Sequence, residues 1–141
     1  MYYVNRASID ARLACVPDIA KALTELAEHW RGTLLEGLAQ ERALHLSIEI
    51  VTDVGSSLID GFLMRDASSY EDIIDIIAGE GVLPADVSGP LRRLVALRRP
   101  LVQDYAGWAR SELHDLTPEL PILLSRFSEL VRSYLRSELG E

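Results

Sequence analysis

Residues 33–62, TLLEGLAQERALHLSIEIVTDVGSSLIDGF, decide the fold of this chain. Wound as a helix, this stretch leaves only a narrow polar side, and it does not alternate as a strand would. Its apolar positions are Leu44, Leu46, Ile48, Ile50, Val51, Val54, Leu58, Ile59 and Phe62. A helix that is apolar on most of its circumference is buried at the centre of a bundle or against a partner subunit. We therefore predict one long central helix over 33–62.

The segment before it, about 5–30, predicts one amphipathic helix. Asn5 or Ser8 can cap its start, and we expect Pro17 to kink it. Arg31 and Gly32 break the pattern before the central helix begins. The apolar positions that recur at three, four or seven residues are Ile9, Leu13, Val16, Leu23, Leu26 and Trp30.

Four further helical segments are predicted after the central one. A short helix over about 69–78 starts with a loose capping box of Ser69 and Asp72, and another covers about 85–97. Pro100 disfavours helical geometry at the residue before it, so we expect a kink or break there and a new helical start near Pro100. The sequence Thr-Pro-Glu at 117–119 predicts the start of the last helix, with an N-cap hydroxyl, proline at the first helical position and an acid facing the helix dipole. The predicted buried stripe of that last helix is Leu120, Leu123, Phe127, Leu130, Val131 and Tyr134.

Together these elements predict an all-α, up-and-down bundle of about five helices in a single domain spanning 1–141, because short connections between long helices favour antiparallel neighbours. Gly55 and Gly61 are expected to permit close approach of other helices. With 48% hydrophobic and 26% charged residues the composition is that of a globular domain. One cysteine, Cys15, excludes an internal disulfide framework. The first residues contain no apolar signal region and no run reaches the length of a membrane span, so we expect no membrane association and a cytoplasmic location.

The charge is distributed unevenly along the chain. The whole chain carries −8, but the segment 91–110 carries +4 and the remainder −12. A local basic island is a better signal for a phosphate site than global basicity, because it localises the electrostatic field. The alternative is that these arginines pair with carboxylates of neighbouring helices. We favour pairing for Arg92 and Arg93, and phosphate contact for Arg98.

Inside the basic island, residues 97–105 read LRRPLVQDY, in which Arg98, Gln103 and Tyr105 form the pattern R-x4-Q-x-Y. This pattern resembles the R-x4-H-x-Y motif of the HepT-like toxins of the HEPN superfamily, with glutamine where the family has histidine. Arg99 stands where an asparagine often follows the motif arginine. The stretch DGFLMRDASSYEDIIDIIAGEGVL is similar to the middle helix and turn of that family, and RSYLRSELGE to the close of a bacterial branch that also carries the glutamine. The resemblance covers nearly the whole chain.

The resemblance implies a HEPN-like bundle of five helices that forms a homodimer. In such a dimer two motifs meet in one composite, metal-independent ribonuclease site that needs no cofactor. The family's toxins are silenced by a small nucleotidyltransferase antitoxin, which adenylylates the motif tyrosine. By this resemblance Tyr105 is the candidate adenylylation site, Arg98 and Arg99 are candidate phosphate-binding residues, and Arg98, Gln103 and Tyr105 are the candidate catalytic residues.

Gln103 changes what the site can do chemically. Cleavage of RNA without a metal needs a group that takes the 2′-hydroxyl proton and a group that stabilises the charged phosphorane. Arginine supplies the second through its permanent charge and paired donors. Histidine exchanges a proton near neutral pH, whereas a glutamine amide does not. If the histidine acts as acid or base, its loss costs roughly 10²–10⁴-fold in rate.

Two functions therefore stay open: a weakened ribonuclease toxin, or a non-enzymatic, dimeric helical partner or RNA-binding module. A purely structural alternative places Arg98 in a salt bridge, Tyr105 in packing and Gln103 in solvent.

The narrow polar side of the central helix is the second candidate feature. Five residues that step by four, four, three and four positions share one helix face: His45, Glu49, Asp53, Ser56 and Asp60. Glu49 and Asp53 are candidates to orient Arg98. The same face as a metal site is disfavoured, because no other ligand-rich segment converges on it. The remaining alternative is a solvated edge with pairing along the helix.

Overall fold

The computed structural model describes residues 2–140, and every regular element in that range is helical. These elements are α1 (Arg6–Leu13), α2 (Val16–His29), α3 (Leu34–Gly61), α4 (Tyr70–Gly79), α5 (Ala85–Ala96), the π-helical turn η1 (Arg99–Gln103), the 3₁₀ turn η2 (Tyr105–Gly107) and α6 (Leu120–Leu139). The all-α prediction is confirmed. Residues 2–140 contain six α-helices where about five were predicted, and the predicted first helix is divided into two. The break falls at Ala14 and Cys15, and Pro17 sits in the first turn of α2, where its missing N–H costs no hydrogen bond.

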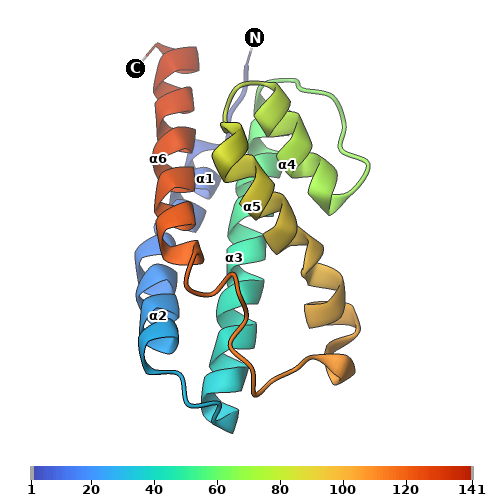
Figure 1. Ribbon diagram of the computed structural model, residues 1–141. Coiled ribbons are helices and arrows are strands. Elements are labelled where there is room, and N and C mark those ends of the chain that lie inside the picture. The colour runs from blue at the N-terminus through green and yellow to red at the C-terminus, as the bar shows by residue number, and fades with distance from the viewer. Residues whose placement is uncertain (1, 141) are drawn as a thin grey trace.

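The central helix α3 has the predicted bounds. Its N-cap Thr33 accepts a hydrogen bond from the backbone N–H of Glu36 (3.2 Å), and the Glu36 carboxylate accepts one from the N–H of Thr33 (3.0 Å). Asn5 caps α1 in the same way. Helices α1 and α2 pack on one side of α3, α4 and α5 on the other, and α6 packs against α2 and α5 (Figure 1). The apolar circumference of α3 is therefore covered largely by the chain itself.

Glycines on α3 allow other parts of the chain to approach closely, as predicted for Gly55 and Gly61. A Cβ atom at Gly55 would overlap the side chain of Ile73 on α4, and one at Gly61 would lie 2.9 Å from Val4. Gly37, which the sequence did not single out, faces the backbone of Arg110 in the same manner. At these three positions a helix, the N-terminal segment and the loop before α6 approach α3 at distances that only glycine permits.

The connection between α3 and α4 turns back along the bundle, so α4 runs in the same direction as α3 and antiparallel to α5 (Figure 1). Ser69 caps α4 as predicted, because its hydroxyl accepts from the N–H of Asp72 (3.0 Å). The carboxylate of Asp72 does not complete a capping box. It binds the guanidinium of Arg65 through two contacts of 2.7 Å and accepts from the N–H of Ser68, and these partners hold the pKa of Asp72 well below its usual range.

The predicted start of the last helix at Thr117 is wrong, because α6 begins at Leu120. Thr117 is fully buried and donates its hydroxyl hydrogen to Oε1 of Gln40 on α3 (2.7 Å) instead of capping a helix. Gln40, also fully buried, accepts a second hydrogen bond from the N–H of His114 (2.9 Å) and donates one to the carbonyl of Glu112 (3.0 Å). This single side chain fastens the loop before α6 to the central helix.

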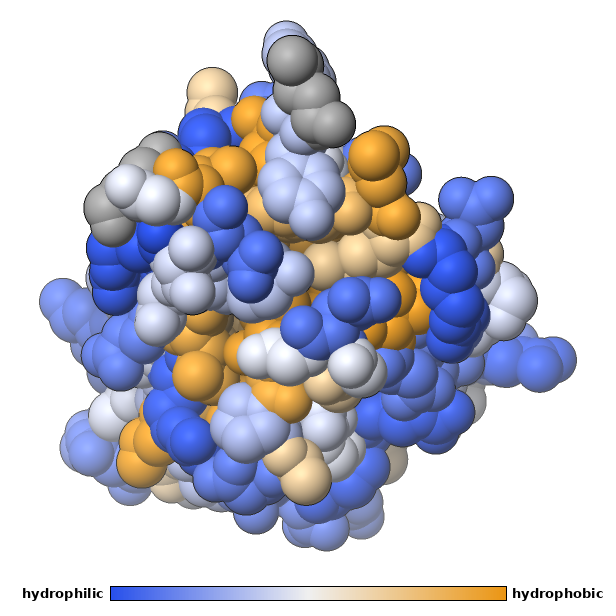
Figure 2. Space-filling view, turned by 90° about the horizontal axis from the view of Figure 1, so that it is seen from above, coloured by the Kyte–Doolittle hydropathy of each residue, from blue (hydrophilic) through white to orange (hydrophobic). Residues whose placement is uncertain are grey.

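The amphipathic helices leave a mainly hydrophilic surface with some apolar residues exposed. Seen from the end of the bundle that carries both termini, apolar atoms reach the surface in the middle, inside a rim of hydrophilic side chains (Figure 2). Among the described residues, no helix is both long and apolar enough to cross a membrane.

Candidate functional site

The predicted motif lies where α5 gives way to the π-helical turn. α5 ends at Ala96, and residues 99–103 then form one wide turn closed by a hydrogen bond from the N–H of Asp104 to the carbonyl of Arg99 (2.9 Å). Pro100 lacks an N–H and so cannot extend α5 with regular α-helical bonding. The break expected near Pro100 is therefore present, but the new helix expected there is only this π turn. Short π-helical segments often occur at functional sites.

Arg98 stacks on an aromatic ring at the end of α5. Its guanidinium carbon lies 4.1 Å from the centroid of the Tyr70 ring, at the start of α4. The Nε atom of Arg98 is buried and has no hydrogen-bond partner among the described residues. A cation over a ring face is held in place without using up its hydrogen-bond donors. Arg98 is thus positioned; its buried Nε is out of reach of a ligand, whereas the terminal nitrogens of its guanidinium make no hydrogen bond within residues 2–140 and can meet an anion.

Three other arginines of the basic island have carboxylate partners, whereas Arg93, for which pairing was also predicted, has no ion pair within residues 2–140. Arg92 pairs with Asp75 on α4 (3.1 Å), as predicted, and Arg110 pairs with Glu41 on α3 (3.0 Å), which raises the pKa of Arg110. Arg99 lies 3.6 Å from Asp104, and both side chains are largely exposed. An exposed pair of this kind contributes little energy and exchanges readily for another anion. Within residues 2–140 no ion pair engages Arg98.

Tyr105 and Gln103 are both exposed. Tyr105 is 61% exposed and lines one side of a shallow groove. This groove lies between the turns η1 and η2 and the first half of α3. The groove is lined by Leu38, Glu41, Arg42, His45, Leu101, Val102 and Tyr105. Arg98 instead leans toward α4, so within residues 2–140 no hydrogen bond or ring contact joins Arg98 to Gln103 or Tyr105. The single chain presents the three motif residues along one exposed segment and does not assemble them into one cluster.

The polar residues on one face of α3 contact different partners. Nε2 of His45, in the groove beside Tyr105, lies 3.2 Å from Oε1 of Glu49. Asp53 pairs with Arg12 on α1 (3.4 Å). Neither carboxylate contacts Arg98 within the described chain, so their predicted role in orienting Arg98 stays a prediction. No group of three or more histidine, cysteine, aspartate or glutamate side chains in residues 2–140 is placed to hold a metal ion.

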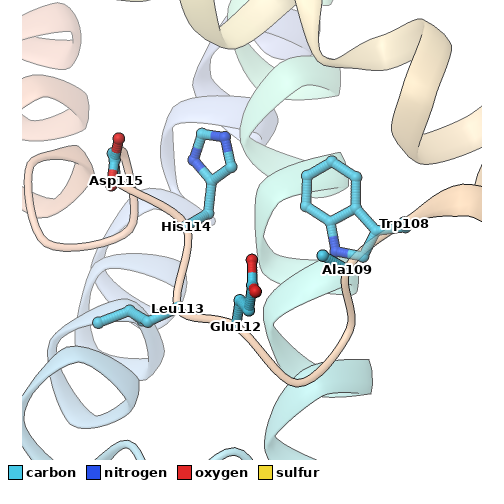
Figure 3. Close-up of a pocket in the computed structure, with 6 residues that line it drawn as sticks. All are labelled: Trp108, Ala109, Glu112, Leu113, His114 and Asp115. Carbon is cyan, nitrogen blue, oxygen red and sulfur yellow. The ribbon is translucent and has the colours of Figure 1, made fainter.

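A separate pocket lies in the loop after the motif, lined by Trp108, Ala109, Glu112, Leu113, His114 and Asp115 (Figure 3). The rings of Trp108 and His114 stack with centroids 5.7 Å apart. Nδ1 of His114 accepts a hydrogen bond from the N–H of Leu116 (3.0 Å), and burial lowers the pKa of His114. His114 therefore has a structural role in the loop, and the two acidic side chains make this pocket unfavourable for a phosphate.

Two features of the site lay beyond the sequence analysis. Tyr70 and Arg98 are 28 positions apart and belong to no common motif, so nothing in the sequence pairs them. His45 was recognised on the polar face of α3, but its position opposite Tyr105 depends on how the π turn packs against that helix.

The chain is similar to known proteins in sequence and in fold. The family model described as "Ribonuclease HepT-like" matches residues 14–130. The chain is 39% identical over 140 residues to the Bacillus subtilis (strain 168) protein named "Putative RNase YutE", covering 99% of this chain and 96% of the relative. The solved structure of YutE, described as a cytosolic protein, superimposes with a TM-score of 0.90 over 100% of this chain and 97% of YutE, at 35% identity.

A more distant structure shares the fold. A mutant of the toxin–antitoxin MntA-HpeT has a TM-score of 0.75 at 13% identity, covering 91% of this chain and 99% of that chain. The family model spans most of the chain and YutE matches along its whole length, with the motif on an exposed turn at the end of α5. The chain belongs to the HepT-like ribonuclease family.

Proposed function

We propose that this protein is a metal-independent ribonuclease toxin of a toxin–antitoxin pair, weakened by Gln103 in place of the motif histidine. The observation that carries this proposal is Arg98, which is stacked on Tyr70 and left without a counterion in an otherwise acidic chain. A fixed guanidinium with free donors suits the phosphate of RNA and the extra charge of a phosphorane. Arg99, whose exposed pair with Asp104 exchanges easily, extends the same positive surface.

Two copies of the chain are expected to form the complete site. The first turns of α3 expose Leu34 (69%), Leu35 (79%) and Leu38 (46%), and Leu38 also lines the groove beside Tyr105. Covering these leucines with a second copy would bring two motif segments together. Light scattering at micromolar concentration tests this homodimer, and a monomer would contradict it.

The expected partner is a nucleotidyltransferase antitoxin that adenylylates Tyr105. The exposure of the Tyr105 side chain supports this role, because a transferred adenylyl group needs an accessible hydroxyl. A location in the cytoplasm is proposed from YutE, which is described as cytosolic.

The second candidate function is a non-enzymatic RNA-binding module or dimeric partner protein. The observation that favours it is Gln103 itself, which is exposed and has no titratable group. RNA cleavage by purified protein distinguishes the two functions. Cleavage that disappears in Arg98→Ala supports the ribonuclease. If only Gln103→His cleaves RNA, the protein is a scaffold that has lost its proton-transfer group, and the binding function replaces the enzymatic one.

A further inference from the structure

One histidine faces the groove beside the motif. His45 on α3 lines the same groove as Tyr105, and the π turn that begins after Arg98 contributes Leu101 and Val102 to its opposite wall. The other two histidines lie elsewhere: His29 is at the exposed end of α2, and His114 holds the loop before α6. His45 is therefore the histidine whose imidazole borders the motif segment within the described chain.

The contact between His45 and Glu49 determines which nitrogen is free. A carboxylate accepts hydrogen bonds, so the contact of 3.2 Å places the hydrogen on Nε2 and leaves the lone pair on Nδ1. A carboxylate that holds one imidazole nitrogen while the other acts as a base is the arrangement used by many general bases. With 29% of its side chain exposed, His45 is accessible from the groove while partly shielded from water.

The charged groups around His45 are of both signs. On its own helix His45 is faced by Glu41, Arg42 and Glu49, and on the 3₁₀ turn by Tyr105. Glu41 is neutralised by its ion pair with Arg110. Arg42 lines the groove without an ion pair within the described residues and can contact a phosphate there, while Glu49, on the Nε2 side of the imidazole, is a carboxylate of opposite sign.

We propose that His45, held by Glu49, is the general base of this protein and replaces the histidine that Gln103 has displaced from the motif. The inference rests on the proposed ribonuclease function and names the group that would accept the proton in place of the motif histidine. Nδ1 of His45 takes the proton of the 2′-hydroxyl as O2′ forms a bond to phosphorus and the bond from phosphorus to O5′ breaks. The leaving O5′ takes a proton from water, and the hydroxide so formed removes the proton from His45. The products are a 2′,3′-cyclic phosphate and a 5′-hydroxyl end.

The test is cleavage of a mixed-sequence single-stranded RNA oligonucleotide by the full chain. The set comprises wild type, Arg98→Ala, His45→Gln and the double variant His45→Gln/Gln103→His. His29→Gln serves as the matched control, since it removes an exposed imidazole that does not line the groove. Circular dichroism and the melting temperature establish that each variant is folded.

We expect His45→Gln to lower the Arg98-dependent rate by about 10²–10⁴-fold, His29→Gln to leave it unchanged, and Gln103→His to restore activity in the double variant. The wild-type rate should fall as the pH is lowered, because protonation removes the lone pair that accepts the 2′-hydroxyl proton, and the residual rate of His45→Gln should lack this dependence. A merely structural role for His45 would not change the pH profile or permit rescue from position 103.

Two outcomes overturn the inference in distinguishable ways. If His45→Gln cleaves within about threefold of wild type while Arg98→Ala does not cleave, the ribonuclease function stands and His45 is not its base. If wild type cleaves no faster than Arg98→Ala, the ribonuclease function and the role of His45 fail together.

Discussion

Replacing Gln40 by alanine is expected to destabilise the protein strongly. Its fully buried amide makes three hydrogen bonds of 2.7–3.0 Å, to Thr117, His114 and Glu112. A hydrogen bond contributes about 1 kcal/mol net, and a buried group left without a partner costs about 1–3 kcal/mol. Since the substitution orphans a buried hydroxyl and two groups of the loop backbone, we expect a loss of about 3–5 kcal/mol. That is a large share of the roughly 5–15 kcal/mol by which a domain is stable.

Urea unfolding followed by circular dichroism measures this loss as a shift of the midpoint at unchanged slope. The control is the other glutamine of the chain, because Gln103→Ala removes an exposed amide and should change stability by less than about 0.5 kcal/mol. A loss below about 1 kcal/mol for Gln40→Ala would refute the reasoning. It would mean that the loop before α6 finds other partners and is not fastened by this side chain.

Three further predictions concern packing, pH and ligand binding. Gly55→Val should cost about 1–3 kcal/mol in urea unfolding, since its side chain would overlap α4, whereas Gly79→Ala, with open space at its Cβ, should not; equal effects would contradict the close approach. Because burial lowers the pKa of His114, this histidine binds its proton more tightly in the unfolded chain than in the folded one. Its contribution to the free energy of unfolding is therefore present above about pH 6.5 and is lost as the pH falls below that value. His114→Gln should therefore lose less melting temperature than wild type between pH 8 and pH 5, and an equal loss would exclude His114 as the cause. Tyr70→Ala should weaken RNA binding about two- to fivefold by releasing Arg98, while Tyr70→Phe retains the ring and the affinity; equal binding by all three proteins would show that the stacking does not position Arg98.

The boundaries that could be predicted from sequence are those set by local contacts. The caps at Asn5 and Ser69 could be predicted because an N-cap side chain bonds to a backbone group three residues away. Thr117 carried the same signal and was misread. Instead of accepting from a backbone N–H of the last helix, the Thr117 hydroxyl donates to the buried Gln40, 77 positions earlier in the chain. A local signal fails when a distant side chain competes for the same group.

At the candidate site, the sequence indicates the motif segment 98–105 but not the residues that contact it. The pattern of Arg98, Gln103 and Tyr105 could be recognised because it lies within eight consecutive residues. The partners of these residues could not, since Tyr70 reaches Arg98 only through the antiparallel packing of α4 on α5. The residues of the motif could therefore be predicted from the sequence, whereas their geometry depends on contacts between helices.

By itself the sequence determined the helical class, the long central helix and the position of the motif, because apolar periodicity, caps and proline act over one or two helical turns. Only the tertiary structure decided that Arg98 is held by an aromatic ring and left without a counterion, and that His45 faces Tyr105 across a groove. These pairings join residues 28 and 60 positions apart, and such contacts depend on how whole helices pack, which no local pattern encodes.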